Sequence, residues 1–181
     1  MNKRKAENQR VKAAITSTLL ELMEKKEISD ITITEIIRKA NVARASFYRN
    51  YSSKEDVLVT LVRDVLQDFR ESADYDLSEV YTYRHIRRTF EYFRQYKDAA
   101  LNLYRSGHGI MLLEELNHFH EEIAGTMPAS SSAKYTLYTY SGALFNTVLM
   151  WLQDKNAVDL DTIARIFTEE WSSNSESPSN P

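Results

Sequence analysis

The sequence predicts an all-α protein. Its 181 residues include only four Gly and three Pro, and two of those Pro lie among the last four positions. Apolar residues recur every three or four positions over most of the chain, as in amphipathic helices. About nine helices are expected: an N-terminal three-helix head that contains a helix-turn-helix, followed by a larger C-terminal helical domain.

The composition indicates the cellular compartment in which the protein is expected. The chain has no cysteine, which excludes a disulfide framework and a thiolate zinc site and favours a reducing compartment, the cytoplasm. No segment approaches the roughly 18 apolar residues that a membrane span needs, so no membrane association is expected. Residues 1–10 are basic but precede no continuous apolar segment, and we therefore expect no signal peptide.

Charge divides the chain unevenly. Residues 1–54 contain 12 Lys and Arg against six Asp and Glu, a net charge of +6. Residues 55–181 contain 11 against 20, a net charge of −9. A basic lobe joined to an acidic one suggests that only the first meets a polyanion. The alternative is a chance segregation of solvated charges.

The first three helices are predicted from their own local signals. Apolar residues at helical spacing define a helix over about 6–26. Thr32 and Glu35 match a capping box that opens a helix ending near Ala40. Asn41 follows, and Asn tolerates the left-handed conformation of a tight turn. A helix of about seven residues then begins near Ala43, with Phe47 and Tyr51 facing inward.

The outward face of the third helix suggests nucleic-acid recognition. Ala45 and Ser46 are small enough to let the helix enter a major groove closely. Arg44 and Arg49 can reach guanine edges or phosphates, and the Tyr48 hydroxyl can donate to a phosphate. The alternative is an ordinary helical hairpin with a solvated basic face.

The next helix begins at Ser52 or Ser53 and runs to about Ser72. Lys54 lies in its first turn, where a cation opposes the helix dipole by about 0.3–1 kcal/mol. A lysine at this position is easier to understand if it binds a phosphate. The alternative is that the negative charges of Glu55 and Asp56 in the same turn offset the unfavourable charge of Lys54.

Residues 32–58, TITEIIRKANVARASFYRNYSSKEDVL, resemble the DNA-binding signature of TetR/AcrR-type transcriptional regulators. The resemblance is close over about residues 6–60, and the rest matches only in helical layout. It implies DNA contacts at Thr34, Arg44, Ser46, Tyr48, Arg49 and Lys54, and it suggests that Lys3, Arg4 and Lys5 reach backbone or an adjacent minor groove. Two positions depart from the pattern: Asn41 replaces the usual Gly, and Ala43 replaces a capping Ser, a loss of about 1 kcal/mol.

The acidic remainder is expected to form helices over about 79–96, 98–105, 110–124, 133–154 and 159–171. Loops are expected at 74–78 and 125–132, and Ser106-Gly-His-Gly109 is expected to break the chain. The predicted domains are residues 1–52, residues 53–171 and a disordered polar tail over 172–181.

The helix over 133–154 is apolar nearly all round, so we expect it to be covered on two sides. Together with the helix over 159–171 it predicts a homodimer built on a four-helix bundle. The residues expected at the interface are Leu144, Val148, Trp151, Ile163 and Phe167. The alternative is a single-chain core.

Aromatic residues with polar tips gather in the second lobe and suggest a pocket for a small-molecule effector of unknown identity. The candidate lining residues are Tyr92, Tyr96, Met111, His118, Tyr138 and Phe145. The alternative is a core of ordinary Tyr residues with hydrated hydroxyls. No cofactor is expected, and His118 and His120 lie on different helix faces, which argues against a metal.

The predicted function is that of a dimeric regulator, a repressor, that binds an inverted-repeat operator in double-stranded DNA and is released by an effector. A rival hypothesis keeps the DNA-binding head but has the second lobe bind a protein. A third, an all-α enzyme with a basic head, lacks any catalytic constellation in the sequence, so no enzymatic activity is expected.

Overall fold

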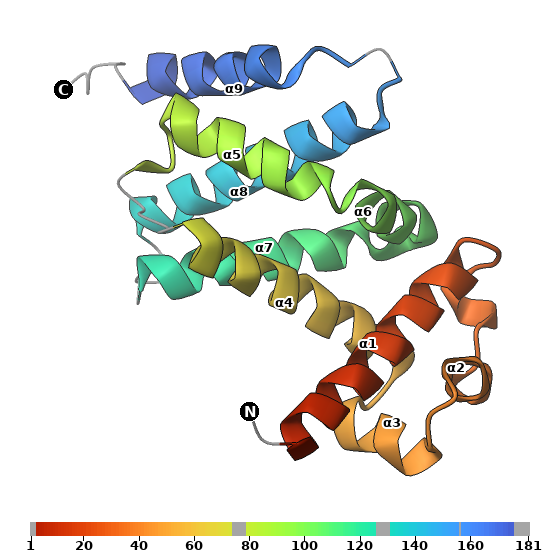
Figure 1. Cartoon of the computed structure of the whole chain (residues 1–181). Coiled ribbons are helices and arrows are strands. Elements are labelled where there is room, and N and C mark those ends of the chain that lie inside the picture. Colours follow the sequence, from red (N-terminus) through yellow and green to blue (C-terminus); the bar gives the residue numbers. More distant parts are fainter. Residues whose placement is uncertain (1–2, 74–78, 126–130, 156, 176–181) are drawn as a thin grey trace. The chain divides into compact units, whose positions relative to one another are not determined.

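The computed structural model describes residues 3–73, 79–125, 131–155 and 157–175, without the side chains of 3, 73 and 171–175. Within these ranges the chain is helical and contains no strand, which confirms the all-α prediction (Figure 1). The predicted loop at 74–78 and the last six residues of the predicted disordered tail fall outside the described residues.

The chain divides into two compact units. The first comprises residues 1–66 and 102–115, and the second comprises residues 67–101 and 116–181. This grouping differs from the predicted division after residue 52. The core of the first unit explains the difference, because Val57 and Leu58 lie in it and Leu103 joins from a distant part of the chain.

The first unit begins with helix α1 (Lys3–Met23), against which α2 (Ile33–Ala40) and α3 (Arg44–Asn50) both pack. A short 3-10 turn, η1 (Ile28–Asp30), joins α1 to α2, and α4 (Lys54–Ala73) follows α3. Ile15, Leu19, Ile36 and Phe47 are fully buried in the shared core. Burying a side chain such as Phe47 contributes about 1.5–3 kcal/mol, so this core fixes where α3 lies.

An ion pair joins α4 to α7 (Gly109–Ala124) inside the first unit. The Nε of Arg63 donates to one carboxylate oxygen of Glu115 at 2.6 Å, and its Nη2 donates to the other at 3.0 Å. The side chain of Glu115 is only 8% exposed. A carboxylate removed from water in this way needs a bidentate partner, so the pair fixes the two helices together.

The second unit is held by aromatic packing. Here α5 (Tyr83–Arg94) packs against α8 (Ser132–Gln153) and α9 (Leu160–Ser175). Phe90 of α5 makes edge-to-face ring contacts with Trp151 and Phe167. The hydroxyl of the buried Tyr140 donates to the Val80 carbonyl at 3.1 Å. The hydroxyl of Tyr140 therefore has a hydrogen-bond partner although it lies in an apolar core.

Several boundaries differ from the sequence prediction for local reasons. Helix α5 begins at Tyr83 rather than near 79, because the Thr82 hydroxyl accepts from the backbone N–H of His85 and caps the helix there. Helix α9 continues to Ser175, beyond the predicted end near 171. Between α6 (Lys97–Leu103) and α7 lies a π-helical turn, Tyr104–His108, in which Gly107 has a φ of 84°. The predicted break at 106–109 is therefore a kink.

Candidate nucleic-acid interface

The turn between α2 and α3 is fixed by backbone chemistry. The Thr32 hydroxyl accepts from the Glu35 N–H at 3.1 Å and opens α2, as the capping box predicted. Asn41 ends α2 in the left-handed conformation (φ 53°, ψ 46°). The Asn41 N–H donates to Arg38 and the Val42 N–H donates to Ile37, which is the hydrogen-bond pattern of a Schellman motif. Asn41 thus does what glycine does in most helix ends of this kind.

Helix α3 is anchored on one side and open on the other. Phe47 is fully buried and contacts the ring of Tyr51, with centroids 5.8 Å apart. Ala43 precedes the helix and provides no side-chain cap. The position of α3 therefore depends on the buried aromatic pair more than on a side-chain cap at its N-terminus. The sequence predicted both the inward pair and the missing cap.

The open face of α3 presents the predicted recognition residues. Arg44, Ala45, Tyr48 and Arg49 are exposed, and Ser46 is half-buried. Arg44 Nη2 donates to the Tyr48 hydroxyl at 3.2 Å, and the guanidinium lies 5.3 Å from the centre of the tyrosine ring. The two side chains are therefore held together in one exposed group that offers N–H and O–H donors to an acceptor such as a phosphate.

A second hydrogen bond orders the other end of this face. Arg49 Nη2 donates to the Ser46 hydroxyl at 3.1 Å. Most of the donors of the Arg49 guanidinium are left for other partners, because the group has five N–H bonds. Thr34 is exposed on α2. Five of the predicted contact residues thus lie on α3, and Thr34 lies on the neighbouring helix α2.

Lys54 has a structural role that the sequence did not reveal. Its Nζ donates to the backbone carbonyls of Ile28, Ser29 and Ile31 at 2.5, 3.2 and 2.7 Å. An ammonium has three N–H bonds, so these acceptors use its whole capacity. The side chain ties the start of α4 to the η1 turn. The expected phosphate contact of Lys54 stays a prediction that would require these bonds to be exchanged.

The six candidate pocket residues are divided between the two units. Met111 packs against the core of the first unit, whereas the other five belong to the second. Tyr92 and Tyr96 lie one turn apart on consecutive segments, with hydroxyls 3.4 Å apart. His118 is exposed, and Tyr138 donates to Glu121 at the surface. Phe145 packs beside Leu149 and Leu152. The grouping rested on residue type, which does not encode which helix faces meet.

The predicted dimer residues lie in or against the core of the second unit. Leu144 and Phe167 are buried in the core of the second unit, at 3% and 6% exposure. Val148, Trp151 and Ile163 are partly buried against the same core. These five side chains therefore pack within their own chain. The exposed face of α8 instead carries Tyr135, Thr139, Asn146 and Met150.

A buried polar pair was missed by sequence reasoning. His120, 1% exposed, lies 2.7 Å from the Ser141 hydroxyl through its Nδ1. Burial lowers the pKa of His120 to about 4, and the nearby His85 adds to this effect. The pKa of His85 is itself lowered, mainly by burial. Both imidazoles are therefore neutral at pH 7.

The residues that the structure describes contain no group of three or more His, Asp or Glu side chains suited to a metal ion. None of the helices in those ranges combines the length and apolar content that crossing a membrane requires.

The comparisons with known proteins agree with the geometry of the first unit. Residues 15–61 match the family described as bacterial regulatory proteins, tetR family. The uncharacterized HTH-type transcriptional regulator YxbF of Bacillus subtilis (strain 168) is 38% identical over 55 residues, which cover 30% of this chain. The match spans only 14% of the length of that relative.

Solved structures extend the likeness to the whole fold. A TetR transcriptional regulator from Streptococcus agalactiae 2603V superposes with a TM-score of 0.63 at 20% identity, covering 92% of this chain and 96% of that one. The dihydroxyacetone kinase operon activator DhaS gives 0.57 at 14% identity, covering 91% and 95%. FadR from Bacillus subtilis, in complex with stearoyl-CoA, gives 0.54 at 16% identity, covering 87% and 95%.

The helix-turn-helix unit and these matches define a DNA-binding transcriptional regulator. Residues 15–61 thus carry the DNA-binding region of the tetR family, and the fold of the whole chain is similar to that of a solved TetR regulator. The matched family and relatives are transcriptional regulators rather than enzymes.

Proposed function

We propose that this protein is a dimeric transcriptional repressor that places α3 in the major groove of an inverted-repeat operator. The observation that carries the proposal is the exposed face of α3, where Arg44, Tyr48 and Arg49 stand on a helix anchored by the buried Phe47. Small side chains at Ala45 and Ser46 allow close approach to the bases. The protein acts in the cytoplasm and needs no cofactor.

Dimerisation follows from the proposed operator symmetry, because two half-sites one helical turn or more apart need two copies of α3. The exposed face of α8 is the surface we assign to the partner copy. Tyr135 and Met150 are 68% and 71% exposed on it. Gly142 lies between them along the helix, and a side chain added there would meet nothing within 4 Å. A glycine facing open space allows a second helix to approach closely.

Release by an effector is the proposed means of control. FadR was solved with stearoyl-CoA, which supports a small molecule as the ligand class without identifying it for this chain. Helix α4 contributes residues 54–66 to the first unit and 67–73 to the second. An effector that binds one conformation of the second unit more tightly shifts the equilibrium of the whole chain, and α4 is one of the helices that connect this unit covalently to the DNA-binding helices.

The test is binding to the DNA just upstream of the protein's own gene, measured by fluorescence anisotropy at two salt concentrations. Specific binding should exceed binding to a random duplex of equal length, and affinity should fall with salt. Tyr48→Phe removes one O–H donor and should weaken binding several-fold. Equal affinity for both duplexes would refute the proposal. A reporter gene placed after the same DNA distinguishes repression from activation.

A second candidate function is a DNA-binding regulator whose second unit binds a protein partner. The exposure of Tyr135, Tyr138 and Met150 along one helix favours it, since aromatic residues and Met are enriched at protein interfaces. A purified protein that is monomeric while still binding DNA would support this candidate over the homodimer.

A further inference from the structure

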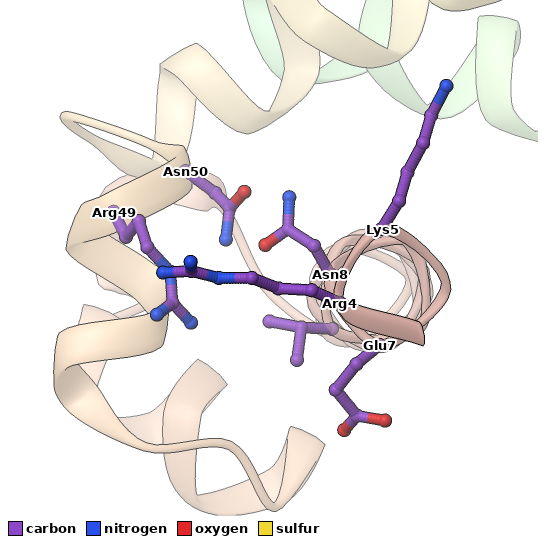
Figure 2. A pocket seen from close by; sticks show the side chains of 7 residues that line it. Arg4, Lys5, Glu7, Asn8, Arg49 and Asn50 are labelled. Atoms are coloured by element: carbon purple, nitrogen blue, oxygen red, sulfur yellow. The ribbon is translucent and has the colours of Figure 1, made fainter. Parts of the chain in front are cut away.

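The first unit contains a cleft of about 940 Å³ between α1 and α3. Figure 2 shows its lining, which consists of Arg4, Lys5, Glu7, Asn8, Val11, Arg49 and Asn50. Arg4, Lys5 and Arg49 are residues that the sequence already suggested for DNA contact, so this cleft belongs to the interface proposed above. The second unit contains a polar feature that the DNA interface does not use.

Three helices of the second unit contribute to this buried polar group. His85 lies on α5, Asn117 and His120 lie on α7, and Ser141 lies on α8. His120 and Ser141 are 1% and 0% exposed, and Nδ1 of the first is 2.7 Å from the hydroxyl of the second. His85 is close enough to His120 for its charge to lower the His120 pKa. Four polar side chains thus lie in a unit whose core is otherwise apolar and aromatic.

The hydrogen bonds of Ser141 fix the tautomer of His120. The Ser141 hydroxyl donates to the Leu137 carbonyl at 3.0 Å, which uses its one hydrogen. The hydroxyl therefore accepts from the Nδ1–H of His120, and the other nitrogen of the neutral imidazole, Nε2, is then an acceptor. Within the described part of the chain no group donates to Nε2. The lone pair of this nitrogen is left for another partner.

Asn117 provides a second acceptor one helical turn away. Among the described residues, its Oδ1 is the one buried side-chain polar atom without a hydrogen-bond partner. Residues three apart on a helix share a face, with Cβ atoms about 5–6 Å apart, so Asn117 and His120 are neighbours on α7. Asn117 as a whole is half-buried, so this face extends from the core to the surface. A buried acceptor without a donor costs free energy, which indicates a partner from outside the chain.

The two acceptors define the chemistry of that partner. Both are uncharged, and one group with two N–H bonds can donate to both. A carboxylate has no hydrogen to donate, and an ammonium would lose its hydration in the core without gaining an opposite charge. An uncharged –NH2 group, as in a primary amide, meets both conditions. The neighbours Leu116 and Phe119 on α7 are buried, so the rest of the ligand is expected to be apolar.

We propose that Asn117 and His120 bind the uncharged –NH2 group of an apolar effector in the second unit. The proposal rests on the proposed function and names the chemical class of the effector. Binding supplies the amide oxygen and the imidazole nitrogen with the donors that the chain itself does not provide. The conformation that holds the effector is therefore favoured when the effector is present.

The experiment is urea unfolding of the full chain, without DNA, in the presence of three probes of similar size. Benzamide carries the –NH2 group, N,N-dimethylbenzamide has the same ring and carbonyl without an N–H bond, and benzoate has a carboxylate instead. Tryptophan fluorescence is the signal, because both Trp residues belong to the second unit. Benzamide should raise the unfolding midpoint increasingly with its concentration. It should bind at least about tenfold more tightly than N,N-dimethylbenzamide, because each of two hydrogen bonds contributes about fivefold.

A variant of Asn117 assigns the effect to this site. Asn117→Leu removes one acceptor and should lower the affinity for benzamide about fivefold, with no loss for N,N-dimethylbenzamide. The free protein should be at least as stable as wild type, because an apolar group replaces a buried acceptor that lacked a donor. A failure to fold therefore cannot imitate the result. Asn146→Leu, the same change at an exposed position of α8 in the same unit, is the matched control and should keep the wild-type response.

Several outcomes would overturn the proposal. Equal shifts with benzamide and N,N-dimethylbenzamide, or no shift with benzamide, would remove the –NH2 group from the argument. Stabilisation by benzoate would show that the Asn117 amide presents its N–H bonds rather than its oxygen. Destabilisation by Asn117→Leu without any response to benzamide would assign the amide oxygen to a bound water only.

The proposed function fails separately from the site. Wild-type protein without preference for the upstream duplex would refute the function, whatever benzamide does in the absence of DNA. A clear preference for that duplex, together with no response to benzamide, would refute only the assignment of Asn117 and His120.

Discussion

Protonation of His120 should destabilise the second unit in mild acid. The imidazole is 1% exposed, and its Nδ1 is 2.7 Å from the Ser141 hydroxyl. The centre of its ring lies 5.5 Å from that of Phe119 and 5.4 Å from that of Tyr140. Charging a group in such surroundings costs free energy, because burial removes the imidazole from the water that would solvate its positive charge. The second buried imidazole, His85, adds repulsion when it is protonated.

The magnitude follows from the two pKa values. Burial lowers the pKa of His120 to about 4 in the folded chain, against an ordinary value of 6.5 for a solvated imidazole. Because the folded pKa is the lower one, the unfolded chain binds more protons, and stability is fully present above pH 6.5 and is lost as the pH falls toward 4. Between pH 7 and pH 5 the expected loss from His120 alone is about 2 kcal/mol.

The assay is urea unfolding of wild type and His120→Asn at pH 7, 6 and 5, followed by tryptophan fluorescence. Both Trp residues belong to the second unit, so the signal follows the part of the chain that holds His120. The variant should lose about 2 kcal/mol less than wild type over this range. Ser141→Ala, which keeps the imidazole, is the control and should retain the wild-type pH dependence.

The pH window also separates His120 from the carboxylates. Asp159, Asp161 and Glu121 have pKa values below their ordinary range, so they lose their favourable charge only in stronger acid. An identical pH dependence of wild type and His120→Asn between pH 7 and pH 5 would show that the folded chain accommodates the charged imidazole, and the reasoning would be refuted.

Three further predictions concern other parts of the chain. Ala43→Ser should stabilise the first unit by about 1 kcal/mol by capping α3, as measured by urea unfolding followed by circular dichroism; no gain would mean that the cap geometry is already satisfied otherwise. Lys54→Met should destabilise the same unit by about 1–3 kcal/mol by leaving its carbonyl partners without their donor. Unchanged stability with a reduced DNA salt slope would instead place Lys54 on a phosphate. Gly142→Leu should raise the stability of the protomer, since glycine is unfavourable in a helix by about 1 kcal/mol, yet weaken the dimer in light-scattering measurements. A dimer of unchanged affinity would remove α8 from the interface.

The helix-turn-helix could be predicted from the sequence because its signals are local. Thr32 and Glu35 are three residues apart, and Asn41 ends α2 by its own backbone conformation. Phe47 and Tyr51 are one helical turn apart and identify the inward face of α3 without reference to the rest of the chain. The five predicted residues on α3 needed only the helical period to be placed together.

The second unit could not be predicted at the same depth. Because α8 is apolar on two sides, its sequence does not indicate which side packs against its own chain. In the structure Leu144 and Phe167 are buried together in the core of the second unit. Met111 was grouped with Tyr138 by residue type, although the two belong to different units.

Local signals were enough to predict the all-α class, the order of the helices and the chemistry of the exposed face of α3, because helical periodicity, caps and turn residues act over a few positions. The contacts of the long side chains became known from the folded arrangement alone. Lys54 reaches the carbonyl of Ile28 across 26 positions of chain, and Arg4 and Arg49 line one cleft from separate helices. Such pairings depend on which helix faces meet, and the free energy that selects them is the burial of a core shared by many residues.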